Sequence, residues 1–122
     1  MSEIFFGACA FICIGGFFIH EIKGTPLMIP PLEDSDLQPN VKGLLKFSWH
    51  VGSILSLGIG SLFMITIAIP GNELMSKVGT AMLIGMALIA LSMSYKNPVM
   101  RKTPAPYLWP FSSLLGILGI YL

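Results

Sequence analysis

Four long apolar segments dominate the chain, and they restrict its fold more than any other feature. They cover residues 4–22, 44–69, 76–95 and 107–122. A helix rises 1.5 Å per residue, so about 20 residues cross the roughly 30 Å hydrocarbon core of a bilayer. The first and last segments are slightly short, which local thinning of the bilayer accommodates. We expect an all-α integral membrane four-helix bundle, built as two hairpins in a single membrane domain over residues 1–122.

The scarcity of charge supports the same expectation. Only 11% of the 122 residues are charged, against about 25% in typical soluble domains. A soluble chain this short has a large surface for its volume and needs polar residues to cover it. The net charge of +1 and the scattered basic residues give no case for a nucleic-acid partner. The expected partner is therefore the lipid bilayer.

Turn-forming residues separate the four segments. The sequence IPGNEL at 69–74 predicts a tight turn, with Asn72 as the cap of the third helix. Prolines interrupt residues 96–106, and they are also frequent in residues 23–43, which carry an acidic cluster as well. We therefore expect loops at 23–43 and 96–106. The first would be ordered or lie along the membrane, with room for a short helix after Asp36.

Basic residues predict the orientation of the chain in the membrane. Six of them lie in or directly beside the two proline-rich loops, namely Lys23, Lys42, Lys46, Lys96, Arg101 and Lys102, whereas Lys77 is alone on the opposite side. Cytoplasmic loops carry an excess of lysine and arginine. Loops 23–43 and 96–106 are therefore expected in the cytoplasm and both termini on the non-cytoplasmic side. The membrane we expect is a bacterial inner membrane.

Four ionisable residues mark the junction of the first two segments. His20 and Glu21 close the first segment, and Lys46 and His50 open the second. Two adjacent antiparallel helices bring all four residues to a similar depth. A polar group in hydrocarbon costs several kcal/mol unless it is paired, so we expect these side chains to form a polar cluster.

Two interpretations of this polar cluster remain open. In the first it fixes the depth and pairing of the two helices, with Lys46 extending its amine toward the interface. In the second it is a site for a proton, an anionic head group or a metal. His20, Glu21 and His50 are a ligand set suited to Zn or Fe, although their spacing matches no H-E-x-x-H motif. The sequence requires no cofactor and leaves a transition metal open.

Small residues predict where the helices pack. Gly52, Ser56 and Gly60 recur every four positions in the second segment, and Ala81 and Gly85 form a similar pair in the third. Such residues let another backbone come close, within the chain or between copies. The opposite face of the second segment is expected to contact lipid through Val51, Ile54, Leu55, Leu62, Ile65 and Ile69.

Sulfur-bearing residues form two further stripes. Cys9 and Cys13 lie four positions apart in the first segment, and the third segment carries Met75, Met82, Met86 and Met93. Such soft ligands suit Cu(I). The two stripes lie on different helices, however, and no Cys-x-x-Cys or Met-x-x-Met motif is present. We interpret both stripes as packing residues.

Two short stretches carry a resemblance to known proteins. In GFFIHEIKGTPLM and LLKFSWHVGSI, a histidine closes the first span and a Trp-His pair opens the second. This pattern resembles that of small, poorly characterised bacterial four-span membrane proteins. Its carriers are His20, Gly24, Pro26, Trp49 and His50. The resemblance implies pairing of two hairpins and brings no particular activity.

Three functional hypotheses follow. The leading one is a non-enzymatic membrane component that self-associates or serves as an accessory subunit of a larger membrane complex. The first alternative is a small transporter or channel for protons or a metal ion that uses His20, Glu21 and His50. The second alternative is a metal-dependent membrane enzyme. Ser112 and Ser113 have no base partner nearby in the sequence, so no nucleophilic triad is indicated.

Overall fold

The computed structural model describes all 122 residues and contains only helices and connecting turns. The first helix is continuous and comprises α1 (Ser2–Ile19), the π-helical turn η1 (His20–Gly24) and α2 (Thr25–Glu33). The remaining elements are α3 (Pro39–Ala68), α4 (Glu73–Lys96), the 3₁₀ turn η2 (Pro98–Lys102) and α5 (Ala105–Tyr121). The all-α class is therefore confirmed.

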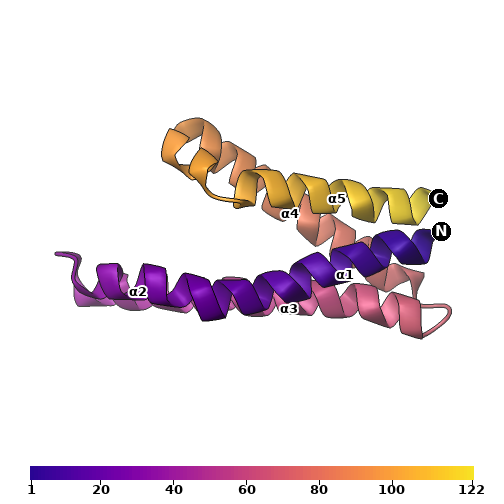
Figure 1. Cartoon of the computed structure of the whole chain (residues 1–122), viewed down its shortest axis with the longest axis horizontal. Helices are drawn as coiled ribbons and strands as arrows, with labels where there is room; N and C mark the ends of the chain where they lie inside the picture. Colours follow the sequence, from indigo (N-terminus) through magenta and orange to yellow (C-terminus); the bar gives the residue numbers. More distant parts are fainter.

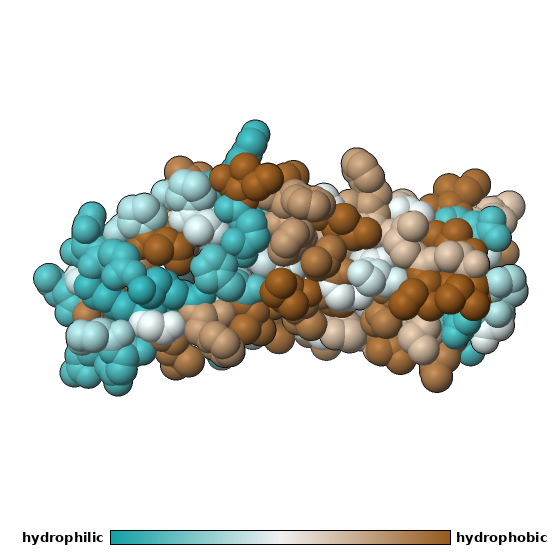
Figure 2. Space-filling model, turned by 90° about the horizontal axis from the view of Figure 1, so that it is seen from below, coloured by the Kyte–Doolittle hydropathy of each residue, from teal (hydrophilic) through white to brown (hydrophobic).

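Three helices are long and apolar enough to cross a membrane. They are Ser2–Glu33, Pro39–Ala68 and Glu73–Lys96, with 32, 30 and 24 residues. The fourth, α5, has 17 residues, which makes it about 26 Å long at 1.5 Å per residue. The space-filling view shows hydrophilic residues gathered at one end of the molecule and hydrophobic residues across its middle (Figure 2).

The expected loop at 23–43 is helical over most of its length, which corrects that expectation. Pro26 lies in the first turn of α2, directly after the π-helical turn η1. Pro30 and Pro31 lie inside α2, and each deprives one carbonyl of its helical partner. Since α2 buries none of its residues, water can bind those carbonyls. Only residues 34–38 lie outside the helices here.

The turn between α3 and α4 is tight, as predicted. Gly71 has a φ of 86°, the only positive φ in the chain, and glycine adopts this conformation without a steric penalty. Asn72 precedes α4 but its side chain does not cap that helix. Its amide nitrogen Nδ2 instead donates to the carbonyl of Ile69 at 3.3 Å.

The helices form two hairpins that diverge from one end of the molecule (Figure 1). One hairpin pairs the first helix with α3, and the other pairs α4 with α5. The hairpins contact each other through α1 with α5 and through α3 with α4. Both termini lie at the end where the hairpins meet, whereas η2 and the tip of α2 lie toward the other end.

The core is small and lies between α1, α3 and α4. It consists of seven buried residues: Phe6, Cys9, Ala10, Cys13, Ile59, Phe63 and Leu83. The rings of Phe6 and Phe63 stack with their centroids 5.8 Å apart. Only 21 of the 122 residues are buried, so most apolar side chains face outward. On α3 and at its C-cap these include Val51, Ile54, Leu55, Ile65 and Ile69, five of the six residues expected to contact lipid.

The predicted packing residues divide into two groups. Ser56 and Gly60 pack against α1, where Ser56 Oγ donates to the carbonyl of Cys13 at 2.8 Å. Gly52 and Gly85 have no atom within 4 Å of the position a Cβ would take, and Ala81 is exposed. These three residues therefore do not pack within the chain, and their packing between copies stays a prediction.

Ala81 and Gly85 were expected to mark the packing face of α4, but small residues lie on more than one face of this helix. The helix buries a different face, which carries Ser76, Gly79, Thr80, Leu83, Ala87, Ala90 and Ser94. Gly79 accommodates the ring of Phe63, whose Cε2 would lie 3.1 Å from an added Cβ.

Replacing Gly60 with alanine is expected to lower the free energy of unfolding by about 1–3 kcal/mol. The added Cβ would lie 2.6 Å from Cγ1 of Ile14 and 3.3 Å from the carbonyl oxygen of Ala10, so α1 and α3 must separate. Unfolding in mixed micelles, followed by far-UV circular dichroism, measures the effect.

Gly52→Ala is the matched control, because its Cβ meets no atom within 4 Å. Alanine also favours helix over glycine by up to about 1 kcal/mol. The control variant should therefore be as stable as the wild-type protein or more stable. Equal losses in the two variants would contradict the close packing of α1 on α3.

Candidate functional site

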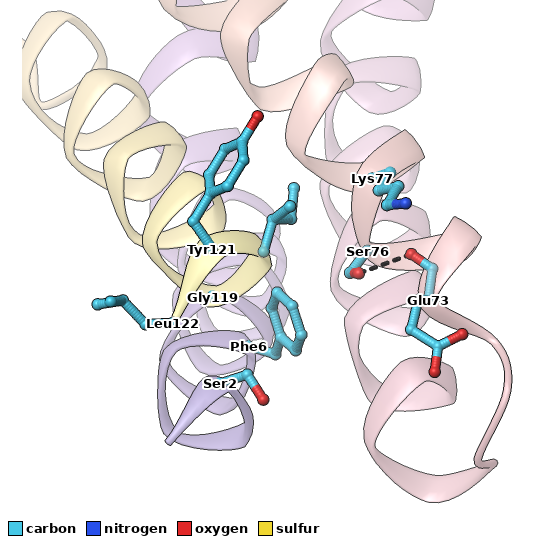
Figure 3. A pocket seen from close by; sticks show the side chains of 9 residues that line it. Ser2, Phe6, Glu73, Ser76, Lys77, Gly119, Tyr121 and Leu122 are labelled. Carbon is cyan, nitrogen blue, oxygen red and sulfur yellow. Dashed lines mark hydrogen bonds between the residues drawn. The ribbon is translucent and has the colours of Figure 1, made fainter.

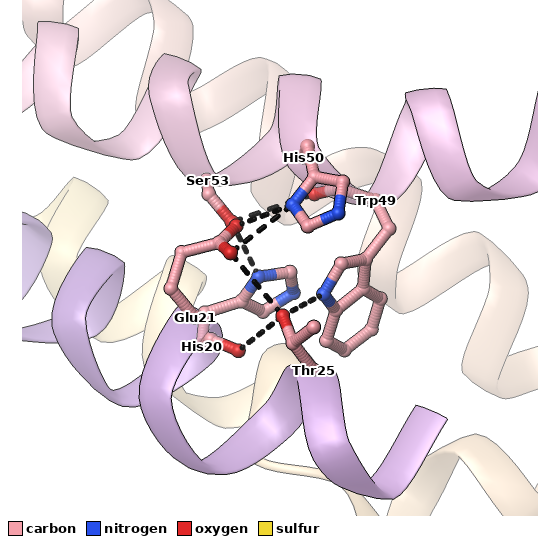
Figure 4. A network of polar contacts seen from close by, with 6 residues as sticks. All are labelled: His20, Glu21, Thr25, Trp49, His50 and Ser53. Carbon is pink, nitrogen blue, oxygen red and sulfur yellow. Dashed lines mark hydrogen bonds and ion pairs between the residues drawn. The ribbon is translucent and has the colours of Figure 1, made fainter. Parts of the chain in front are cut away.

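The most concentrated set of side-chain hydrogen bonds lies where η1 and the start of α2 face α3 (Figure 4). We call it the polar joint. It consists of His20, Glu21, Thr25, Trp49, His50 and Ser53. Three of these residues come from the first helix and three from α3, so the polar joint connects the two arms of the first hairpin.

The π-helical turn positions the first-helix members of the polar joint. Its hydrogen bonds span five residues, and the backbone N–H of Thr25 donates to the carbonyl of His20. Pro26 follows directly, and its ring would clash with the carbonyl four residues before it in a regular α-helix. The wider turn relieves that clash. It therefore lets the helix continue into α2 while His20, Glu21 and Thr25 face α3.

Gly24 allows the indole of Trp49 to lie against the first helix. A Cβ at Gly24 would lie 2.9 Å from Cζ2 of Trp49. The indole stacks on the ring of His20 with centroids 3.7 Å apart and planes 20° apart. Its Nε1 donates to Thr25 Oγ1 at 2.9 Å. Trp49 is thus held by one ring face and one hydrogen bond at once.

Glu21 and His50 form the charged part of the polar joint. Nδ1 of His50 lies 3.0 and 3.1 Å from the two carboxylate oxygens of Glu21. Thr25 Oγ1 donates to Oε2 of the same carboxylate at 3.2 Å. The side chains of His50 and Glu21 are 49% and 27% exposed. The pair is therefore reached by water.

His20 has a separate partner. Its Nδ1 lies 2.6 Å from Oγ of Ser53, and Ser53 is 1% exposed. The donor in this contact follows the tautomer of the imidazole. A buried hydroxyl that is paired in this way avoids the cost of desolvation without a partner, so the contact also fixes the register of α1 against α3.

Lys46 lies outside the polar joint, which corrects its expected place in the cluster. Its amine forms an ion pair with Glu33 at the end of α2. The amine of Lys42 donates to the backbone carbonyl of Glu33. Because the first helix continues to Glu33 instead of ending near His20, Glu33 lies beside α3 about three helical turns beyond Glu21. The ion pair between Lys46 and Glu33 was not expected from the sequence.

The expected metal ligands His20, Glu21 and His50 are neighbours but do not converge on one point. No group of three or more His, Cys, Asp or Glu side chains in the structure is placed to hold a metal ion. The reason is geometric: Nδ1 of His20 faces Ser53, while Nδ1 of His50 faces Glu21. The interpretation of the three residues as a metal site is corrected accordingly.

The sulfur stripes also lie apart from the polar joint. Cys9 and Cys13 are free, buried thiols in the core. Sγ of Cys9 donates to the carbonyl of Ser112 on α5 at 3.4 Å. Of the methionine stripe on α4, Met82 and Met86 pack against the core, whereas Met93 is exposed.

Thr25 was not foreseen as a site residue. It contacts Glu21 and Trp49, and so joins the charged pair to the aromatic stack. The signal in the sequence is the stretch Gly24-Thr25-Pro26, in which a small residue and a hydroxyl precede a proline inside a helix. Proline in a helix demands a local change in the hydrogen-bond pattern, which marks the position of the π turn.

Comparison with known proteins yields no relative. No protein-family model, curated protein or solved structure matches the chain.

Replacing Gly24 with alanine is expected to displace the indole of Trp49 from the polar joint. The displacement removes its stack on His20 and its hydrogen bond to Thr25, at a cost of about 1 kcal/mol. The sequence contains two tryptophans, so the measurement uses a Trp109→Phe background in which Trp49 alone fluoresces. A red shift of its emission and a lower free energy of unfolding are the expected results.

The matched control is Gly43→Ala in the same background, since its Cβ meets no atom within 4 Å. The emission of Trp49 should stay unchanged in this variant. An unshifted emission in Gly24→Ala would mean that the indole does not lie against η1.

Proposed function

We propose that the chain is a non-enzymatic integral membrane protein that associates laterally with a further helix. That helix belongs to a second copy of the chain or to a larger membrane complex to which the chain is an accessory subunit. The observation that carries the proposal is an apolar groove on α3 and α4 that no part of the chain covers.

The lengths of the helices support membrane insertion. The 32 residues of the first helix and the 30 residues of α3 correspond to about 48 and 45 Å, which exceeds the roughly 30 Å hydrocarbon core. The excess lies in α2 and in the first turns of α3, which project beyond the core. The shorter α5 crosses with local thinning of the bilayer.

The distribution of basic residues supports the orientation. The loop after α2 and the turn η2 both lie toward the same end of the molecule (Figure 1). Residues 23–43 and 96–106 carry five of the seven basic residues, Lys46 follows the first of these segments closely, and Lys77 lies near the opposite end. Because cytoplasmic loops carry an excess of lysine and arginine, we propose that these two segments lie in the cytoplasm. Both termini then lie on the non-cytoplasmic side of a bacterial inner membrane.

The groove has the properties of a helix-packing surface. It has a volume of about 390 Å³ and is lined by Val51, Ile54, Leu55, Gly58, Ile59, Leu62 and Met82. Gly58 has no atom within 4 Å of a Cβ position, so a neighbouring backbone can come close there. In lipid, helices associate through such close van der Waals contacts because lipid tails are as apolar as leucine.

Filling the groove is expected to weaken association. A leucine at Gly58 occupies the space of the partner helix, and a loss of about 1.4 kcal/mol of contact energy weakens binding tenfold. Mass measurement of the detergent-solubilised protein should show dimer or complex for the wild-type chain and a shift toward monomer for Gly58→Leu.

Gly15→Leu on α1 serves as the control, because Gly15 also has free space around it but lies outside the groove. It should associate like the wild-type protein. A wild-type chain that is monomeric at every concentration, and that captures no partner from membranes, would overturn the proposal.

A second candidate function, proton transfer across the membrane, is favoured by the contact between His50 and Glu21 and by His20 on the same helical turn. Three titratable side chains near one interface are a recurrent feature of proton pathways. The exposure of His50 gives this group of side chains access to water.

Liposomes that hold the purified chain test this second candidate. The wild-type chain should dissipate an imposed pH gradient faster than empty liposomes, and His50→Ala should return the rate to that of empty liposomes. Asp36→Ala, in the loop after α2, is the control and should keep the wild-type rate. Absence of flux under every gradient would count against proton transfer and leave the associating subunit as the function.

A further inference from the structure

A pocket lies between the first turns of α4, the first turns of α1 and the last turns of α5 (Figure 3). None of its lining residues belongs to the polar joint. Its volume is about 420 Å³, within the range of roughly 300–1,000 Å³ found for small-molecule sites. Phe6 and Ile120 supply apolar surface, whereas Ser2, Glu73 and Lys77 supply polar surface. The pocket is therefore amphipathic.

The two charged residues of this pocket have no partner within the protein. Glu73 and Lys77 lie four positions apart, a spacing at which glutamate and lysine commonly pair on a helix. The two ion pairs of the structure are Lys46 with Glu33 and His50 with Glu21. Neither includes Glu73 or Lys77, and both of these line the pocket. One positive and one negative group are thus available to a ligand at the same mouth.

The position of the pocket indicates the kind of ligand. The following inference rests on the proposed membrane insertion, which puts this end of the molecule at the non-cytoplasmic boundary of the bilayer. Lipid head groups lie at that depth, and Tyr121 in the lining is a residue type enriched there. A ligand with separated charges on its polar part and an apolar remainder matches the lining.

We propose that this pocket binds one zwitterionic phospholipid of the ethanolamine class. Lys77 binds the phosphate, and Glu73 accepts hydrogen bonds from the ammonium group. The glycerol and the first carbons of the acyl chains pack on Phe6 and Ile120. Ethanolamine is preferred over choline because its ammonium group donates hydrogen bonds to a carboxylate, whereas a quaternary ammonium needs a cage of aromatic rings. Phe6 and Tyr121 are the only aromatic rings in the lining, and Phe6 already stacks on Phe63, so they form no such cage.

Native mass spectrometry of the full chain, titrated with dioleoyl phosphatidylethanolamine, phosphatidylcholine and phosphatidylglycerol, tests the proposal. The wild-type chain should bind one phosphatidylethanolamine molecule roughly fivefold more tightly than it binds either other lipid. This is the difference in affinity that one additional ion pair at the protein surface provides. Glu73→Gln should reduce binding of phosphatidylethanolamine to the level of phosphatidylglycerol. Lys77→Gln should weaken binding of all three lipids.

Two control variants repeat the charge changes away from the pocket. Lys96→Gln, at the other end of α4, and Asp36→Asn, in the loop after α2, should bind lipids like the wild-type chain. Equal affinity of the wild-type chain for the three lipids, or the same losses in the controls as in the pocket variants, overturns the proposal. Alkaline carbonate extraction of membranes separately tests insertion. A chain that stays in the membrane but shows no lipid preference refutes the lipid site alone.

Discussion

The close approach of α1 and α3 is the contact on which the other features depend. Gly60 brings the two backbones together, and the hydroxyl of Ser56 adds a hydrogen bond to the carbonyl of Cys13. In lipid the association of helices gains little from removing apolar surface from water, so such short contacts are what stabilise a pair. Because the pairing begins in the core, the residues further along the two helices meet in register at the polar joint.

The π turn determines what the first helix can do beyond that pairing. It carries Gly24, against which Trp49 packs, and it allows the chain to pass Pro26 without ending the helix. The continuation brings Glu33 beside Lys46, at a place where a helix that ended at His20 would leave Lys46 without a partner. One change of hydrogen-bond pattern therefore explains both the geometry of the polar joint and the length of the first hairpin.

The sequence predicted the helices, the outward face of α3 and the proximity of His50 to the end of the first span, because these follow from periodicity and from antiparallel pairing. The helical conformation of residues 23–33 could not be predicted, because proline normally ends a helix. The helix α2 accommodates its prolines because it is exposed, so water can bind the carbonyls that lose their helical partners. The face of α4 that is buried could not be predicted from the sequence either. When a helix is apolar on several faces, a hydropathy pattern does not distinguish the face that packs from the face that does not, and Ala81 was as plausible a packing residue as Gly79.

The divergence of the two hairpins has a mechanical consequence. The hairpins touch near the termini and separate toward the other end (Figure 1), so the stacked rings of Phe6 and Phe63 lie close to the pivot of a lever. A rotation of one hairpin against the other at that contact would displace η2 and the tip of α2 further than it displaces the residues near the termini. Any molecule that wedges itself beside Phe6 would thereby alter the spacing of segments at the opposite extremity of the chain.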